Sequence, residues 1–162
     1  MKFSYTIIYV PDVAASLNFF ETAFGMNRKF LHESGMYGEL NTGETTLAFA
    51  AHAMGEMHFP AGHVAAHSSI MPLGMEIAFA TDDVSAAHAK ALAAGALELA
   101  APEEKPWGQV VSYVRCPDGS LVELCTPMGT WAALSLRRIT ENVLFDYQIW
   151  WILTKNKVGL TS

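Results

Sequence analysis

One pattern of predicted elements occurs twice in this chain, and this repeat limits the possible folds more than any other feature. In the first copy, a strand-like run of β-branched and aromatic residues at 3–10 is followed by Asp12 and an apolar stripe at helical spacing over 13–24. In the second copy, a similar run at 75–81 is followed by Asp83 and a second apolar stripe. Asp12 and Asp83 are 71 residues apart, and aspartate is a favoured cap for the first turn of a helix. We therefore expect two copies of one structural unit.

Each copy continues with three more strand-like runs, bounded by Gly and Asn turns. They lie at 28–33, 36–40 and 45–51 in the first copy and at 96–99, 109–115 and 121–126 in the second. This order predicts an α+β fold in which two paired βαβββ modules form a curved, mostly antiparallel sheet around a cavity. We expect module one at 1–52, a connector at 53–73 and module two at 74–129, which together make one domain over 1–129.

The last two strands of module two are predicted to form a hairpin around Pro117-Asp118-Gly119, a sequence typical of tight turns. Glu123 interrupts the apolar run that follows this turn. If both faces of that strand are buried, its carboxylate needs a cation, a metal or several hydrogen-bond donors. The alternative is a glutamate on the wet face of an edge strand.

Composition excludes several classes of function. The chain is 51% hydrophobic and 16% charged with a net charge of −6, which is typical of a globular protein and argues against nucleic-acid and anionic-membrane partners. A neutral or cationic small molecule is the partner that such a chain suits. Two cysteines give no disulfide framework, so we expect a reducing, cytoplasmic location. No apolar run reaches the roughly 18 residues of a membrane helix.

Four histidines lie in or next to the connector: His52 immediately before it, and His58, His63 and His67 within it. Such a cluster raises the possibility of a metal site within the loop. No helical pattern surrounds these residues, and their spacings match no compact zinc motif. A lid over a cavity, or a plain crossing between modules, is the alternative interpretation.

Several motifs together make the chain resemble the vicinal oxygen chelate superfamily, which includes glyoxalase I, extradiol dioxygenases, epimerases and bleomycin- or fosfomycin-resistance proteins. The motifs are Tyr9-Val10-Pro11-Asp12-Val13, Ser16-Leu17-Asn18-Phe19-Phe20-Glu21, Phe24-Gly25, Thr81-Asp82-Asp83-Val84 and Pro117-Asp118-Gly119 with Val122-Glu123-Leu124. They extend over residues 1 to about 128. The resemblance implies the two-module fold, and it leaves the chemistry open because one scaffold serves many reactions.

The resemblance also implies where a metal would bind. Metal-dependent members typically use a His on the first strand, a His or Glu late in module one, a His on the first strand of module two and a Glu after the turn. Here these positions hold Tyr5, a stretch at 48–52 in which only His52 is a ligand type, Glu76 and Glu123. One hypothesis is a divalent metal on Glu76, Glu123 and His52; the others are a metal-free polar cavity floored by Tyr5, Glu76 and Glu123, or a hydrogen-bonded cluster of those three without chemistry.

Other side chains on the inner strands are expected to line the same cavity. They are Tyr37, Glu39, Tyr113 and Arg115, with Trp107 from the loop before the penultimate strand. Arg115 has an alternative role as the ion-pair partner of Glu39 or Glu123. Trp107 has an alternative role as an anchor of its loop.

The segment 130–162 lies outside the resemblance and carries more basic than acidic residues, unlike the rest of the chain. It predicts a C-terminal helical extension with an apolar stripe. The superfamily resemblance implies a homodimer, and we expect this tail at the dimer interface.

Three functions remain open on the sequence. The first is a binding protein, similar to the bleomycin-resistance group, that sequesters a small cationic or aromatic compound without a cofactor. The second is a metal-dependent glyoxalase-type lyase or isomerase, or a dioxygenase, that uses a divalent metal. The third is an interaction module in which the cavity is vestigial.

Overall fold

The computed structural model describes residues 1–128. Residues 1–105 and 109–127 form one compact unit that contains both predicted modules. In these described residues, no helix is long and apolar enough to cross a membrane. The 130–162 extension and its place at a dimer interface lie outside the described residues.

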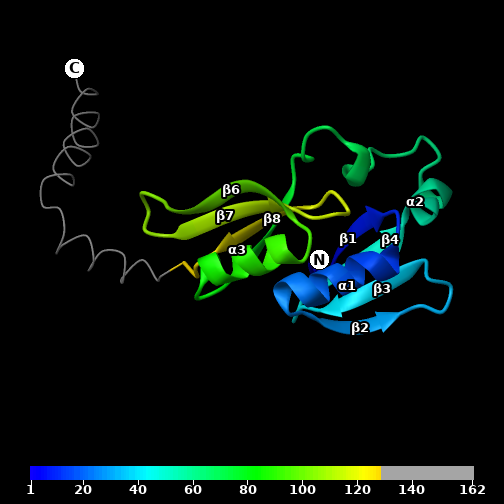
Figure 1. The fold of residues 1–162 in the computed structure, drawn as a ribbon. Coiled ribbons are helices and arrows are strands. Elements are labelled where there is room, and N and C mark those ends of the chain that lie inside the picture. Colours follow the sequence, from blue (N-terminus) through cyan, green and yellow to red (C-terminus); the bar gives the residue numbers. More distant parts are fainter. Residues whose placement is uncertain (129–162) are drawn as a thin grey trace, which may run out of the picture. The chain divides into compact units, whose positions relative to one another are not determined.

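Module one is a four-stranded mixed sheet with one long helix (Figure 1). Its strand order is β1-β4-β3-β2, with β1 parallel to β4 and the other pairs antiparallel. The elements are β1 (Tyr5–Val10), α1 (Val13–Phe24), β2 (Asn27–Leu31), β3 (Tyr37–Asn41) and β4 (Thr46–Ala51). All five predicted elements are present, with ends that differ by one or two residues.

Module two repeats this arrangement, with strand order β5-β8-β7-β6 and a parallel β5–β8 pair. Its elements are β5 (Glu76–Ala80), α3 (Val84–Ala93), β6 (Leu97–Glu104), β7 (Val110–Arg115) and β8 (Leu121–Cys125). Strand β6 is longer than predicted, because residues 100–104 keep pairing with β7 through two register shifts. The predicted β7–β8 hairpin around the Pro117-Asp118-Gly119 turn is confirmed.

The ends of the helices follow local sequence. The Asp12 carboxylate accepts a hydrogen bond from the Ala15 N–H at 2.9 Å, and Asp83 caps α3 in the same way through Ala86. Helix α1 ends at Gly25, which has φ +69° and donates its N–H to the Glu21 carbonyl. A left-handed residue at this place favours glycine.

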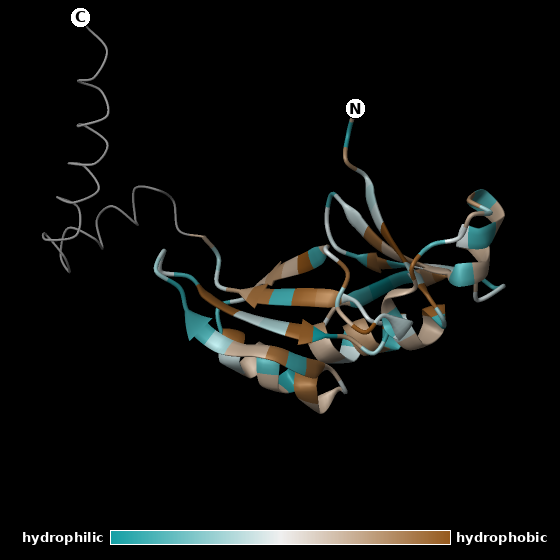
Figure 2. Cartoon of the chain, turned by 90° about the horizontal axis from the view of Figure 1, so that it is seen from above, coloured by the Kyte–Doolittle hydropathy of each residue, from teal (hydrophilic) through white to brown (hydrophobic). Residues whose placement is uncertain are grey.

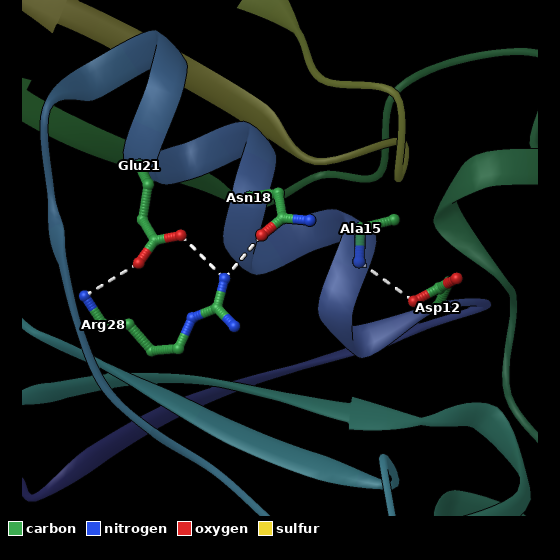
Figure 3. A network of polar contacts seen from close by, with 5 residues as sticks. All are labelled: Asp12, Ala15, Asn18, Glu21 and Arg28. Atoms are coloured by element: carbon green, nitrogen blue, oxygen red, sulfur yellow. Dashed lines mark hydrogen bonds and ion pairs between the residues drawn. The ribbon is translucent and has the colours of Figure 1, made fainter.

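A polar network fixes the outer side of α1 to the start of β2 (Figure 3). The Arg28 guanidinium donates to Glu21 at 2.7 Å and to Asn18 at 2.5 Å. The Arg28 backbone N–H donates to the second Glu21 oxygen at 3.1 Å. These contacts hold the turn at Gly25 closed, so that β2 runs back along the sheet edge.

The two modules share one hydrophobic core. Helix α1 packs on α3 and on its own sheet. Phe20 is fully buried, with its ring centroid 4.9 Å from that of Phe49 in its own module and 6.3 Å from that of Phe79 in module two. Val10, Leu17, Val114, Val122 and Leu124 belong to the same cluster. Burial of these side chains is the main source of stability of the paired modules.

Hydropathy changes from residue to residue along the strands (Figure 2). Since successive side chains of a strand point to opposite faces, each sheet has a core face and a second face, called here the open face. On β1, for example, Ile8 and Val10 are buried while Tyr5 and Ile7 are 49% and 42% exposed. The α+β class and the two-module architecture are confirmed. In the described residues the strands form two separate four-stranded sheets rather than one continuous sheet.

The connector contains two short helices that the sequence did not predict. Helix α2 (His52–His58) starts directly after β4, and a 3₁₀ turn, η1 (Ala66–Ser68), follows nearer to β5. Between them, the Phe59 ring stacks edge-on against Tyr9 of β1, with centroids 5.4 Å apart. The connector is therefore ordered against module one.

Candidate functional site

Two carboxyl groups meet on the open face of module two. Glu76 starts β5 opposite Leu121, and Glu123 lies opposite Ala78, two residues farther along the same parallel pair. Both therefore point to the same side of the sheet. The pKa of Glu123 is raised first by burial, then by the charge of Glu76 and by a hydrogen bond to it. Since two carboxylates cannot hydrogen-bond without a proton, the pair is suited to hold one shared proton.

The negative charge of the two glutamates also raises the pKa of neighbouring side chains on this face. Tyr113 of β7 lies directly opposite Glu123, and its pKa is raised by burial and by both glutamates. The pKa of the Cys125 thiol is likewise raised, first by burial and then by Glu123 and Glu76. Among residues 1–128, no Lys or Arg forms an ion pair with either glutamate. Within the part of the chain that the structure describes, the pair is therefore an anionic site without a counter-ion.

Module one carries a different cluster on its open face. Glu39 of β3 is 6% exposed and accepts hydrogen bonds from Lys29 Nζ at 2.7 Å and from the Tyr37 hydroxyl at 3.1 Å. Burial, followed by the bond to Glu39, raises the pKa of Tyr37 to about 12. The negative charge of Tyr5 would contribute in the same direction, so Tyr5 belongs to this cluster. The Glu39 charge is thus neutralised within its own sheet.

The predicted residues consequently fall into two groups. Tyr5, Tyr37 and Glu39 lie on the open face of module one, and Glu76, Tyr113 and Glu123 lie on that of module two. The Lys29–Glu39 pair was missed by sequence reasoning. The available signal was the proximity of Lys29, on the predicted neighbouring strand, to a buried acid.

The strand register decides whether the expected metal ligands fit. Ile7 pairs with Ala48 on β4, and Ala78, which is 71 residues after Ile7, pairs with Glu123 on β8. Ala48 is thus the counterpart of Glu123, as Tyr5 is of Glu76. Module one offers a phenol and a methyl group where metal-dependent relatives need nitrogen or carboxylate ligands, so the residues present do not fit a divalent metal.

His52 does not fill the missing ligand position. Tyr5 pairs with Thr46, and His52 follows the far end of that strand, six residues and about 20 Å away at the usual rise per residue. Within residues 1–128, no three His, Cys, Asp or Glu side chains are grouped so that they could hold a metal ion.

Arg115 binds the connector. Its guanidinium donates to the carbonyl oxygens of Ala66 and Ser69, both at 2.6 Å, and to that of Ile70 at 3.3 Å. Among the described residues, Arg115 forms no ion pair with Glu39 or Glu123. Trp107 is 51% exposed, and its role in a cavity wall stays a prediction.

A cavity in the described residues lies elsewhere. It has a volume of about 390 Å³ and lies between the first half of α1 and the turn at Pro117 and Asp118. Its lining is mainly apolar and does not include either glutamate of the pair. Glu76 is exposed and Glu123 is half-buried, so a closed cavity over this pair requires a further wall.

Comparison with known proteins agrees with this architecture. The model of the Glyoxalase/Bleomycin resistance protein/Dioxygenase superfamily matches residues 2–124. A comparison with curated proteins finds no match.

Similar solved structures come from several bacteria. A glyoxalase/bleomycin resistance protein/dioxygenase family enzyme from Burkholderia phytofirmans PsJN is 23% identical, with a TM-score of 0.65 over 78% of this chain and 98% of that one. A glyoxalase-related enzyme from Fulvimarina pelagi is 19% identical, with a TM-score of 0.67 over 78% and 88%. TioX from Micromonospora sp. ML1 is 17% identical, with a TM-score of 0.57 over 78% and 98%. At these identities the likeness shows the fold alone.

Proposed function

Because the chain belongs to the Glyoxalase/Bleomycin resistance protein/Dioxygenase superfamily, we propose that it binds a small cationic aromatic compound at Glu76 and Glu123. The observation that carries this proposal is the carboxyl pair, which lies on the open face without a cationic partner in the described residues. A bound cation would replace the shared proton and relieve the repulsion between the two charges. The site is thereby suited to binding rather than to metal catalysis.

The surroundings of the pair favour an aromatic cation over a simple inorganic one. Tyr113 stands opposite Glu123 and presents a ring, which is a surface on which a planar ligand or an ammonium group can stack. Two carboxylates alone would hold a hard metal ion weakly, since such ions require six or more oxygen ligands. An organic cation gains from both the charge and the ring.

A homodimer would supply the missing wall of the site. On module one the open face carries three large exposed side chains, Tyr5, Ile7 and Phe30, with 40–49% of each exposed. Exposed apolar groups on a sheet face are typical of an association surface. We propose that a second copy of the chain covers the open faces, and light scattering on the purified protein tests this stoichiometry.

Fluorescence titration with proflavine, a planar aromatic cation, tests the binding function. Acridine is the matched neutral ring system at pH 7.5. We expect proflavine to bind at least tenfold more tightly than acridine, a difference of about 1.4 kcal/mol. Glu123→Gln should remove most of that preference, because it removes a carboxylate of the pair. Glu44→Gln, in an exposed turn of module one, is the matched control and should leave binding unchanged. Equal binding of the two dyes, or unchanged binding by Glu123→Gln, would refute the proposal.

A further inference from the structure

Three imidazole rings lie end to end along the connector. His52 Nδ1 is 2.7 Å from His63 Nε2, and His52 Nε2 is 3.2 Å from His67 Nδ1. Adjacent ring centroids are 4.9 and 5.1 Å apart, with interplanar angles of 32° and 36°. His52 thus uses both of its ring nitrogens and bridges the two others. This imidazole chain spans the start of α2, the loop after it and η1.

The imidazole chain joins parts of the connector that are also held by other elements. The His63 ring packs against Tyr9 of β1, with centroids 5.1 Å apart, and against Phe59. Beyond His67, the Arg115 guanidinium binds the carbonyl of Ala66. The chain is therefore one of the contacts that dock residues 59–69 on the two modules.

The two nitrogen–nitrogen contacts limit how many protons the three imidazole rings can hold. Each nitrogen–nitrogen contact holds one proton, with a donor on one side and an acceptor on the other. Three neutral imidazoles carry three protons, which fill both contacts and one outer nitrogen. One added proton still fits on the other outer nitrogen. A second added proton must enter a contact, where two N–H groups would then face each other.

We propose that this imidazole chain is an acid-sensitive latch, closed when the three histidines are largely neutral and opened when a second proton enters it. Opening releases the segment 59–69 from β1, while the strands of both modules stay folded. The latch is a property of the connector and does not depend on what the carboxyl pair binds.

The electrostatic surroundings of His52 also favour its neutral form in the docked state. Burial lowers its pKa, and the neighbouring His63 and His67 lower it further, while Glu56 on α2 opposes them. Since the docked state binds fewer protons than the released state, docking is favoured above the ordinary histidine pKa of about 6.5 and is lost as pH falls below it. The facing groups are Tyr9 from β1, Arg115 from β7 and Glu56 from α2. Among these, Glu56 alone favours protonation.

Hydrogen exchange on the full chain, read by mass spectrometry at pH 7.5 and 5.5, tests the latch. Three amides report on the segment, because Phe59, Gly62 and Ser69 each donate to a backbone carbonyl within the connector. After correction for intrinsic exchange, we expect their protection to fall at least tenfold at pH 5.5. Peptides from β1 and β4 should keep theirs.

His52→Gln is the decisive variant, since a glutamine amide both donates and accepts but carries no charge at any pH. It should lose most of the pH response, whereas His32→Gln, in the β2–β3 turn, should keep the whole response. If circular dichroism shows that His52→Gln does not fold, His67→Gln replaces it and should also reduce the response. An unchanged response in the folded variant, or no loss of protection at pH 5.5 in the natural chain, would overturn the proposal.

Discussion

Ala48 and Glu123 occupy the same position in the two modules, one opposite Ile7 on β1 and the other opposite Ala78 on β5. The repeat therefore preserves backbone geometry while the chemistry of its open faces diverges. Module two keeps a carboxyl pair, and module one has a buried acid that its own lysine neutralises. This asymmetry is the reason why we propose a cationic ligand for module two rather than for module one.

The shared proton of the carboxyl pair predicts the effect of Glu76→Gln. Removing the Glu76 charge should lower the pKa of Glu123, which would stay above 4.5 because burial is the larger cause. A raised pKa means that the folded state holds the proton more tightly, so this site stabilises the fold at acid pH and loses that effect as pH rises through the pKa of Glu123. Glu76→Gln should therefore stabilise the protein at pH 7, by about 0.2–1 kcal/mol.

Carbon-13 NMR of the glutamate carboxyl groups measures this pKa, and chemical denaturation measures the stability. Glu44→Gln, which removes an exposed carboxylate of module one, is the control for net charge. A Glu123 pKa that does not move in Glu76→Gln would show that the two groups do not interact.

Tyr37→Phe removes a hydroxyl that donates to the buried Glu39 carboxylate. We expect a loss of about 1–2 kcal/mol, because a charged acceptor loses one of its two donors. An ultraviolet titration should also lose the phenol that ionises at about 12. Tyr5→Phe is the control, since the Tyr5 side chain is 49% exposed, and it should change stability less. Equal losses in both variants would contradict the assigned role of Tyr37.

Gly119→Ala tests how closely the connector approaches the β7–β8 turn. A Cβ at Gly119 would lie 2.1 Å from the Ala66 carbonyl carbon, whereas one at Gly43 would meet nothing within 4 Å. The two glycines have nearly the same φ, +89° and +88°, so backbone strain is matched. Gly119→Ala should destabilise the fold by about 1–3 kcal/mol more than Gly43→Ala does. Equal thermal denaturation midpoints would mean that the connector backbone moves away from residue 119 without loss of stability.

Phe20→Ala tests the shared core. Phe20 is fully buried and contacts rings of both modules, so the cavity left behind should lower the free energy of unfolding by about 3–5 kcal/mol. Phe3→Ala, at a side chain that is 70% exposed, should stay within about 0.5 kcal/mol of the natural chain. Urea denaturation followed by circular dichroism compares them, and a small loss in Phe20→Ala would indicate that the modules are stable separately.

Local sequence was sufficient for the elements that depend on local signals. The caps at Asp12 and Asp83 and the turn at Pro117-Asp118-Gly119 each act within four residues, and all are present as predicted. Strand β6 was predicted too short because its polar and proline-containing second half is kept in the sheet by pairing with β7. That pairing is a long-range contact that no local propensity reveals.

The candidate site was predictable as residue types and not as an arrangement. The repeat aligned Glu76 with Tyr5, and the position of Glu123 after the Pro117-Asp118-Gly119 turn marked it as a candidate. Only the register of the parallel strands showed that Ala48 is the counterpart of Glu123. The four histidines in or next to the connector were visible in the sequence. Which three of them meet in the imidazole chain depends on how the loop folds back onto β1.

The sequence by itself determined the two-module repeat, its helices and turns, because helix periodicity, caps and glycine conformations are properties of short segments. Tertiary structure decided which side chains meet. It paired Glu39 with Lys29, aimed Arg115 at the connector carbonyls and joined His52 to His63 and His67. These contacts link residues that are 10 to 49 positions apart, and their geometry is set by strand register and loop docking, which only the packed fold specifies.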